Sequence, residues 1–185
     1  VDFGEIRDGV ASVTGLADVR RLAFRPGGIL YFASPSTGTL SAYQRDAVMS
    51  TLTGGVLTEG LSGAVDAAAA TTGGTHYYVA SELGALFVID AFGEVVQSLS
   101  DGFGGIDGIG GAAAVVVTPD EGFVYVYGAS DGQIAGFARA GDGTLAPIAG
   151  SPFEARFDGD ALAVSPDGRF LALACASCDE LRTFS

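Results

Sequence analysis

The chain has 185 residues, 48% of them hydrophobic, which is enough to bury a sizeable core in one or two domains. It carries 22 acidic residues against nine basic ones, all arginine, and its formal net charge is −13. This balance excludes binding to nucleic acid, which needs clustered Lys and Arg. The longest apolar stretches, such as Ala112–Val117, are too short for insertion into a membrane.

The first stretch with strand character is residues 3–6 (Phe-Gly-Glu-Ile). It precedes residues 8–26, which align without a gap with residues 101–119. In the second copy, residues 95–99 (Val-Val-Gln-Ser-Leu) are the run just before the aligned segment. We interpret that run as an outer strand, and the same alignment predicts an outer strand at residues 3–6.

A sequence pattern with the character of a turn followed by strands then occurs four times along the chain. Residues 118–137 and 165–184 align without a gap, and looser copies cover residues 25–43 and 71–89. One serine ends the apolar run of each copy, with spacings of 47, 49 and 47 residues: Ser34, Ser81, Ser130 and Ser177. A nearly constant period in this range is typical of stacked or radially arranged supersecondary units.

The third unit predicts four short strands joined by turns. Its first run, Ala112–Val117, is small and β-branched, as in a strand buried on both faces. Pro119 and Gly122 mark the turn that follows. The remaining strands are expected at residues 123–127, 133–138 and 144–149.

The fourth unit supplies three strands, at Ala161–Val164, residues 170–175 and residues 181–184. Its missing outer strand is the one expected at residues 3–6. Strands from both ends of the chain would then complete one sheet and remove its open edge.

Four antiparallel strands per unit of this length predict an all-β fold, the β-propeller, with four blade equivalents. A β-sandwich also has evenly spaced strands, but it does not require four copies of one sequence pattern. We expect a single domain over residues 1–185, with blades at about 16–59, 60–105, 106–156, and 157–185 plus 1–15. Three assemblies remain open: a closed ring in one chain, an eight-bladed ring of two chains, and a segment of a longer array.

The histidine and cysteines offer little chemistry. His76 is the single histidine, and it stands in a predicted strand with no nucleophile motif nearby, so we expect a structural role. Cys175 and Cys178 form one C-x-x-C pair at a predicted hairpin turn, which cannot close a zinc site alone. Two states remain open for them: a local disulfide, which would add little stability, and two buried thiols.

Six aspartates fall in predicted turns or loops: Asp107, Asp131, Asp142, Asp158, Asp160 and Asp179. Turns take Asp for local hydrogen bonds, so most of them are expected to be structural. A hard cation such as calcium needs several converging oxygen atoms. Asp158 and Asp160 are the best local candidates for metal ligands, although no complete calcium loop is present, and we expect no cofactor unless calcium binds there.

Residues 164–170 (Val-Ser-Pro-Asp-Gly-Arg-Phe), followed by an apolar strand, resemble the lactonase-like β-propeller repeat. The linker at residues 101–108 (Asp-Gly-Phe-Gly-Gly-Ile-Asp-Gly) resembles it as well. That family includes bacterial 6-phosphogluconolactonase-like proteins and many secreted or cell-surface repeat proteins, and its members typically have seven blades. The resemblance implies a propeller and, as one possible activity, hydrolysis of a sugar lactone.

Two functions follow as hypotheses. The first is a non-catalytic binding or scaffold module, extracellular or periplasmic, that presents loops to a protein or carbohydrate ligand. The second is a lactonase-like hydrolase of a sugar lactone, for which loop carboxylates could hold an activating metal. We expect no nucleic-acid partner and no membrane insertion, and a homodimer is one of the open assemblies.

Overall fold

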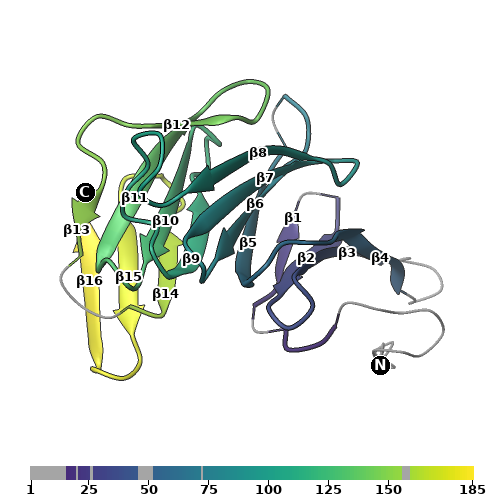
Figure 1. Cartoon of the computed structure of the whole chain (residues 1–185), viewed down its shortest axis with the longest axis horizontal. Coiled ribbons are helices and arrows are strands. Elements are labelled where there is room, and N and C mark those ends of the chain that lie inside the picture. Colours follow the sequence, from purple (N-terminus) through teal and green to yellow (C-terminus); the bar gives the residue numbers. More distant parts are fainter. Residues whose placement is uncertain (1–15, 20, 26, 46–51, 72, 156–158) are drawn as a thin grey trace.

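The computed structural model describes residues 16–19, 21–25, 27–45, 52–71, 73–155 and 159–185. These residues form sixteen β-strands in four antiparallel sheets (Figure 1). The predicted all-β class is therefore confirmed. The outer strand predicted at residues 3–6 and the candidate ligand Asp158 lie outside the described residues. Among the described residues, no helix is long and apolar enough to cross a membrane.

Each sheet follows the chain, so that consecutive strands are neighbours, except that β12 and β13 of sheet 3 both pair with β11. Sheet 1 contains β1 (Ala23–Arg25), β2 (Ile29–Ser34), β3 (Thr39–Arg45) and β4 (Leu52–Thr58). Sheet 2 contains β5 (Ala64–Ala70), β6 (His76–Ser81), β7 (Ala85–Asp90) and β8 (Val95–Ser100). Sheet 3 contains β9 (Ala112–Val117), β10 (Phe123–Gly128), β11 (Gln133–Arg139), β12 (Leu145–Pro147) and β13 (Phe153–Glu154). The described part of sheet 4 contains β14 (Ala161–Val164), β15 (Leu171–Cys175) and β16 (Glu180–Phe184).

The outer edge of sheet 3 differs from the prediction. One strand was expected at residues 144–149, but two short strands, β12 and β13, both pair with β11. Between them the Ser151 N–H donates to the Ile148 carbonyl at 3.1 Å, and Gly150 has a φ of +83°. Pro147 and Pro152 flank this turn, and proline has no N–H to donate to a ladder. The two prolines in the local sequence therefore account for the break between β12 and β13.

The four sheets pack face to face in chain order, and their first strands come together. Strand β5 contacts both β2 and β9, and β9 in turn contacts β14. In Figure 1, sheet 1 and sheet 4 lie at opposite sides of the molecule, with sheets 2 and 3 between them. Small residues in β5, β9 and β14 allow these strands to approach one another, as the sequence indicated.

Each junction between consecutive sheets holds its own apolar core. Large buried members are Tyr77 and Ile89 between sheets 1 and 2, Tyr78 and Phe137 between sheets 2 and 3, and Tyr127 and Leu173 between sheets 3 and 4. Successive residues along a strand point to opposite faces. Neighbouring tyrosines of β6 therefore enter two different cores.

A buried carboxylate connects sheets 2 and 3. Asp66 of β5 is 8% exposed, and its carboxylate accepts the backbone N–H of Val115 in β9 at 3.0 Å. It also accepts the N–H of Ala67 at 2.9 Å and pairs with Arg21 at 3.4 Å. Burial raises the pKa of this carboxyl, while the Val115 N–H and Arg21 act in the opposite direction.

The raised pKa of Asp66 predicts a pH-dependent stability. The folded protein favours the protonated carboxyl, so this group's contribution is full below the unfolded-state pKa and is lost as the pH rises through the folded-state pKa. An Asp66→Asn variant cannot titrate there. The free energy of unfolding of the wild type should therefore fall relative to that of Asp66→Asn as the pH rises above about 4, the ordinary pKa of an Asp carboxyl. Urea titrations across this range measure the difference.

Asp120 provides a control, because its effect on stability should change with pH in the opposite direction. Hydrogen bonds from the Thr118 hydroxyl and the Gly122 N–H lower the pKa of this exposed carboxyl. Its contribution is present above the unfolded-state pKa and is lost as the pH falls. The wild type should thus gain stability relative to Asp120→Asn as the pH rises. A difference for Asp66→Asn that is flat, or that has the sign of the Asp120→Asn difference, would contradict the assignment.

Candidate functional site

The first strands of all four sheets line one cavity of about 560 Å³, on the side where a propeller channel would run. Its lining is mostly Ala, Val and Leu, and its charged members are Arg21 and Asp66. These two groups pair with each other. Burial raises the pKa of Tyr31, a further lining residue, to about 12, which keeps its phenol neutral. The cavity therefore has a mostly apolar wall, and its two charged side chains form an ion pair with each other.

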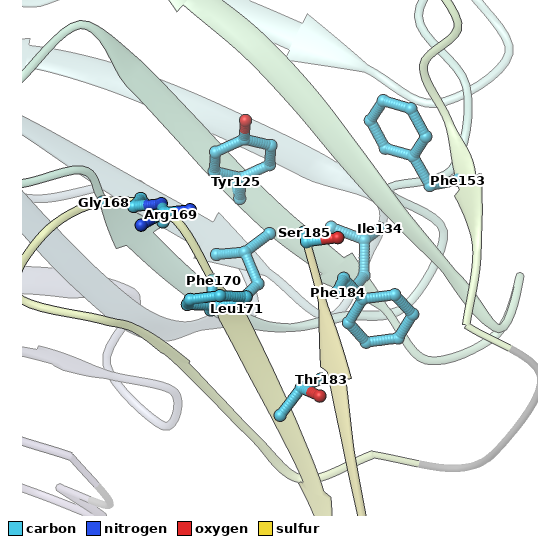
Figure 2. A pocket seen from close by; sticks show the side chains of 10 residues that line it. All are labelled: Tyr125, Ile134, Phe153, Gly168, Arg169, Phe170, Leu171, Thr183, Phe184 and Ser185. Atoms are coloured by element: carbon cyan, nitrogen blue, oxygen red, sulfur yellow. The ribbon is translucent and has the colours of Figure 1, made fainter.

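A second cavity, of about 500 Å³, lies between sheets 3 and 4 and is rich in aromatic side chains. Tyr125 of β10, Phe153 of β13, Phe170 and Phe184 of β16 contribute rings to it. Figure 2 shows these side chains around the opening, with Arg169 on the side away from Phe153 in this view. We call this cavity the aromatic cleft. None of its residues was singled out from the sequence as a candidate site.

Arg169 and Phe170 are held by the repeated turn. The Ser165 hydroxyl donates to Asp167 and accepts the Phe170 N–H at 3.0 Å. Asp167 also accepts the Arg169 N–H at 3.2 Å, and these bonds lower the pKa of its exposed carboxyl. The guanidinium carbon of Arg169 lies 5.7 Å from the centroid of the Phe170 ring, within the range of a cation–π contact. The turn thus presents a cation and a ring together at the cleft.

His76 lies at a different junction and has structural partners. Its Nδ1 atom is 3.2 Å from the Gly74 carbonyl oxygen and 3.4 Å from an Arg139 nitrogen. Arg139 also donates to the Tyr78 hydroxyl at 2.7 Å, and Tyr78 donates to the Gly143 carbonyl at 3.0 Å. The single histidine is therefore part of a network that joins sheets 2 and 3, outside both cavities.

Of the two aspartates predicted as calcium ligands, Asp160 is described, and its carboxylate has a backbone partner. Asp160 accepts the Ala176 N–H at 2.6 Å, across the start of sheet 4. The structure brings three other carboxylates together, with ligand atoms within 4.8 Å of one another: Asp101, Asp107 and Asp131. Each accepts a backbone N–H in the segment 108–110. Asp142 closes a turn through the Thr144 N–H and hydroxyl. Calcium binding stays a prediction.

The sequence had already placed Asp107 and Asp131 in loops, but it did not single out Asp101. Asp101 belongs to the Asp-Gly pair that precedes the third unit. Asp131 lies in the hairpin turn between β10 and β11 of that unit. Only the folding of the linker against this hairpin brings the two carboxylates together.

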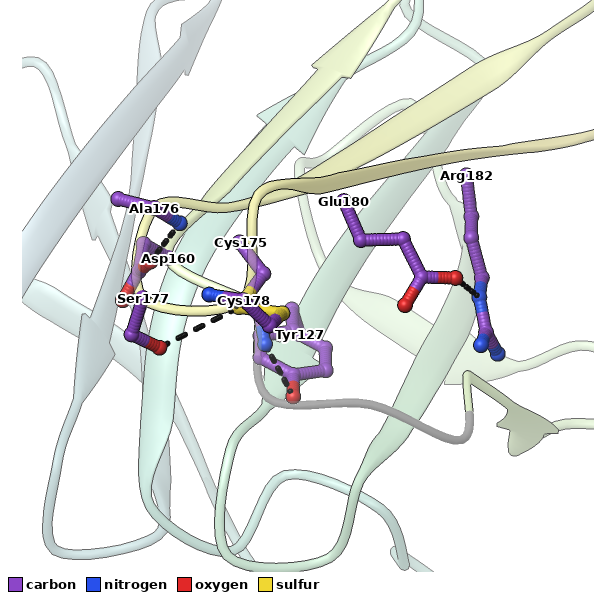
Figure 3. Close-up of a disulfide and its surroundings, with 9 residues drawn as sticks. Tyr127, Asp160, Cys175, Ala176, Ser177, Cys178, Glu180 and Arg182 are labelled. Atoms are coloured by element: carbon purple, nitrogen blue, oxygen red, sulfur yellow. Dashed lines mark hydrogen bonds and ion pairs between the residues drawn. A yellow bond between two sulfur atoms is a disulfide. The ribbon is translucent and has the colours of Figure 1, made fainter.

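Cys175 and Cys178 form a disulfide at the tip of the β15–β16 hairpin (Figure 3). Their Cα atoms are 5.5 Å apart, and Cys175 is buried. The backbone N–H of Cys178 lies 3.0 Å from the Cys175 sulfur, as expected for a tight turn. Nearby, the Tyr127 hydroxyl accepts the Gly159 N–H at 2.8 Å, which links sheet 3 to the entry of sheet 4.

Residues 67–185 match the family model described as "Lactonase, 7-bladed beta-propeller". No curated protein matches the chain.

Similar solved structures include two proteins provisionally named 6-phosphogluconolactonase. The one from Bacteroides fragilis is 17% identical with a TM-score of 0.68, and the match covers 90% of this chain and 50% of that one. The one from Bacteroides uniformis is 18% identical with a TM-score of 0.70, covering 93% and 53%. A functionally unknown protein from Desulfotomaculum acetoxidans is 17% identical with a TM-score of 0.65, covering 91% and 55%. These likenesses show the fold, and the chain spans about half the length of each structure.

The contact between His76 and Gly143 can be tested by adding a methyl group. A Cβ atom on Gly143 would overlap the His76 ring, and the φ of Gly143 is +85°. Gly102 is a matched control, because its φ is +74° and its Cβ would meet nothing within 4 Å. We expect Gly102→Ala to cost about 1 kcal/mol from backbone strain alone. Gly143→Ala should cost about 1–3 kcal/mol more, from overpacking.

Urea unfolding measures both variants, and a His76→Ala, Gly143→Ala double variant completes the test. Removing the ring should abolish most of the extra cost of the Gly143 methyl group. Equal costs for Gly143→Ala and Gly102→Ala would show that the ring does not press on Gly143.

The disulfide should contribute little stability, because it closes a very short loop. In the chain-entropy model, a loop of this size adds at most about 2 kcal/mol. We therefore expect a Cys175→Ala, Cys178→Ala variant to lose no more than about 2 kcal/mol in urea unfolding. Mass spectrometry after alkylation verifies that the wild-type thiols are paired. A larger loss, with the thiols paired, would contradict this expectation.

Proposed function

The chain belongs to the lactonase family of seven-bladed β-propellers, and within that fold we propose that it is a binding module for a small anionic carbohydrate. The aromatic cleft is the observation that carries this proposal. Its volume of about 500 Å³ suits a small molecule. Mostly apolar and aromatic walls with a few polar groups are typical of ligand sites.

The polar groups of the aromatic cleft indicate the ligand. Arg169 supplies a guanidinium, which recognises carboxylate or phosphate oxygens with two parallel hydrogen bonds. The hydroxyls of Tyr125, Thr183 and Ser185 supply further donors and acceptors for a sugar. The rings of Phe153 and Phe184 offer apolar faces to the sugar carbons. A sugar acid or sugar phosphate combines these three chemical features.

Binding without catalysis is favoured by the chemistry of the lining. Among the residues that the structure describes, the side chains lining the aromatic cleft include no Asp, Glu, His or Cys that could act as a base or hold a metal. Hydrolysis needs a base, a nucleophile or a metal to activate water. An extracellular or periplasmic location, where disulfides persist, agrees with the Cys175–Cys178 bond.

The second candidate is hydrolysis of a sugar lactone, which the family description and the names of two similar structures favour. In this chain such chemistry would have to use carboxylates outside the aromatic cleft. Asp101, Asp107 and Asp131 are the described carboxylates that lie close enough together to share a cation. This candidate therefore predicts a requirement for a divalent metal.

Calorimetric titration with 6-phosphogluconate, the open-chain acid of the lactone in question, tests the binding proposal. Arg169→Ala should weaken binding at least about tenfold, since a hydrogen bond to a charged group contributes about 1.5–3 kcal/mol. Arg21→Ala is the charge-matched control, because Arg21 lines the other cavity. Equal affinities for the two variants, or no binding by the wild type, would remove the aromatic cleft as the site.

The same preparations distinguish binding from hydrolysis. Opening of 6-phosphogluconolactone is followed by pH-stat titration, with calcium and with chelator. A rate equal to the spontaneous rate under both conditions supports the binding module. A calcium-dependent rate that is lost in Asp101→Asn would make the chain a hydrolase instead.

A further inference from the structure

The disulfide between Cys175 and Cys178 has no part in the aromatic cleft, since neither residue lines it. We propose that it is a site of thiol–disulfide exchange in the folded protein, at which a dithiol reductant attacks the sulfur of Cys178 and the sulfur of Cys175 leaves. This inference is independent of the proposed ligand. It uses residues 175–178 (Cys-Ala-Ser-Cys), which we call the exchange loop.

The hairpin does not need this disulfide in order to close. Strands β15 and β16 are paired up to Cys175 and Glu180. One repeat earlier, β10 and β11 are paired in the same way up to Gly128 and Gln133. Gly128 and Asp131 occupy the cysteine positions there, so a turn of the same length forms without a covalent link. A bond across so short a loop also removes little entropy from the unfolded chain. Stability of the turn therefore does not explain the pair of cysteines.

The two cysteines differ in their access to solvent. Cys175 is 3% exposed at the end of β15, whereas Cys178 is exposed and lies within the exposed run 176–181. In thiol–disulfide exchange a thiolate attacks one of the two sulfurs, and both the rate and the products depend on which sulfur it can reach. An external thiol therefore attacks Cys178, and the bond breaks with its electron pair on Cys175.

Two hydrogen-bond donors converge on the Cys175 sulfur (Figure 3). The backbone nitrogen of Cys178 lies 3.0 Å from this sulfur, and the Ser177 hydroxyl oxygen lies 3.3 Å from it. A disulfide sulfur carries no hydrogen, so the hydroxyl is the donor. Hydrogen bonds to an anion are stronger than those to a neutral acceptor. The two donors therefore stabilise the departing Cys175 thiolate and favour its release.

The spacing of the cysteines determines how many thiols the reductant needs. After the first step Cys178 is joined to the reductant, and the Cys175 thiolate stays close because only two residues separate the cysteines. Its attack on the mixed disulfide is intramolecular, so it expels a single thiol rapidly. A second thiol on the reductant can compete, because its attack is intramolecular as well. We therefore expect a dithiol to complete a reduction that a monothiol does not.

The complete reaction transfers two electrons from the dithiol to the cysteine pair. In the first step a bond forms between one reductant sulfur and Cys178, and the bond between Cys178 and Cys175 breaks. In the second step the other reductant thiolate attacks the reductant sulfur of the mixed disulfide. The reductant closes its own disulfide, and Cys178 leaves as a thiolate. The two protons of the dithiol pass through water to Cys175 and Cys178.

Carboxylates around the exchange loop select the charge of the reductant. Asp160 accepts the Ala176 N–H at 2.6 Å, and Asp179 is the next residue after the loop. Glu180 follows, but its charge is balanced by Arg182 at 2.7 Å. The negative charges repel an anionic thiol and attract a cationic one. The reductant that fits this site is therefore a dithiol with neutral or basic surroundings.

Reduction of the folded protein tests the proposal. Dithiothreitol is added at several urea concentrations below the unfolding transition, and alkylation followed by mass spectrometry measures the loss of the disulfide. We expect complete reduction at a rate that does not rise with urea, while circular dichroism shows that the sheets persist. A rate that rises with urea in proportion to the unfolded fraction would mean that reduction needs unfolding, and this result overturns the proposal.

A monothiol shows which sulfur is attacked. Brief treatment with cysteamine is followed at once by excess alkylating agent, and fragmentation of the peptide locates both groups. Cysteamine should be found on Cys178 and the alkyl group on Cys175. The reverse assignment overturns the proposed direction of attack.

A Ser177→Ala variant tests the stabilisation of the leaving group. Without this hydroxyl the Cys175 thiolate is a poorer leaving group, so reduction by dithiothreitol should slow about three- to tenfold. Ser98→Ala is the matched control, because Ser98 lies in β8 of sheet 2 and the chemical change is the same. Equal rates for the two variants would overturn the assignment of Cys175 as the leaving group helped by Ser177.

Two monothiols of opposite charge test the electrostatic selection. Cysteamine should react faster than glutathione when both rates are expressed per thiolate, and their ratio should fall between about 0.05 M and about 0.5 M salt. Asp179→Asn should lower the ratio at low salt. A ratio that changes neither with salt nor in Asp179→Asn would overturn the choice of a neutral or basic reductant.

Discussion

The structure depends on one constraint: each sheet has two apolar faces, and both need a neighbouring sheet. Tyr77 and Tyr78 are adjacent in β6, yet Tyr77 enters the core with sheet 1 and Tyr78 the core with sheet 3. A single sheet of this kind cannot bury its own surface. Stability must therefore come from the junctions, as in other repeat proteins, where each unit contacts only the units beside it.

Apolar packing sets the distance between neighbouring sheets. Polar contacts at each junction then fix how the two sheets are aligned with each other. Arg25 donates to Tyr77 at 3.0 Å between sheets 1 and 2. Between sheets 2 and 3, the side chain of Gln97 both donates to and accepts from the backbone of Leu145, at 3.0 and 2.7 Å. Between sheets 3 and 4, Arg182 donates to the Ala155 carbonyl at 3.0 Å. These links differ from junction to junction, so they fix which sheets are neighbours.

The sequence predicted the elements that have a clear local residue pattern. The strands Ala112–Val117 and Ala161–Val164 were predicted to the residue, because each is an apolar run that ends at a Thr/Ser-Pro-Asp turn. The aromatic cleft was not predicted, because its rings come from segments up to 59 residues apart and no periodic pattern connects them. The Asp101–Asp131 proximity was missed for the same reason. The sequence pattern favours candidate ligands in one short stretch, around Asp158 and Asp160, whereas folding brings carboxylates from separate loops together.

The repeat also explains why the aromatic cleft lies where it does. One unit earlier, Phe137 occupies the position of Phe184, and it is 1% exposed in the same core cluster as Leu145 of the outer strand β12. The described part of sheet 4 ends with β16, so no described strand covers Phe184 in that way. Arg169 adds a charge where the earlier copy has Gly122. The aromatic cleft thus lies at a repeat position that is filled by core packing at the preceding junction.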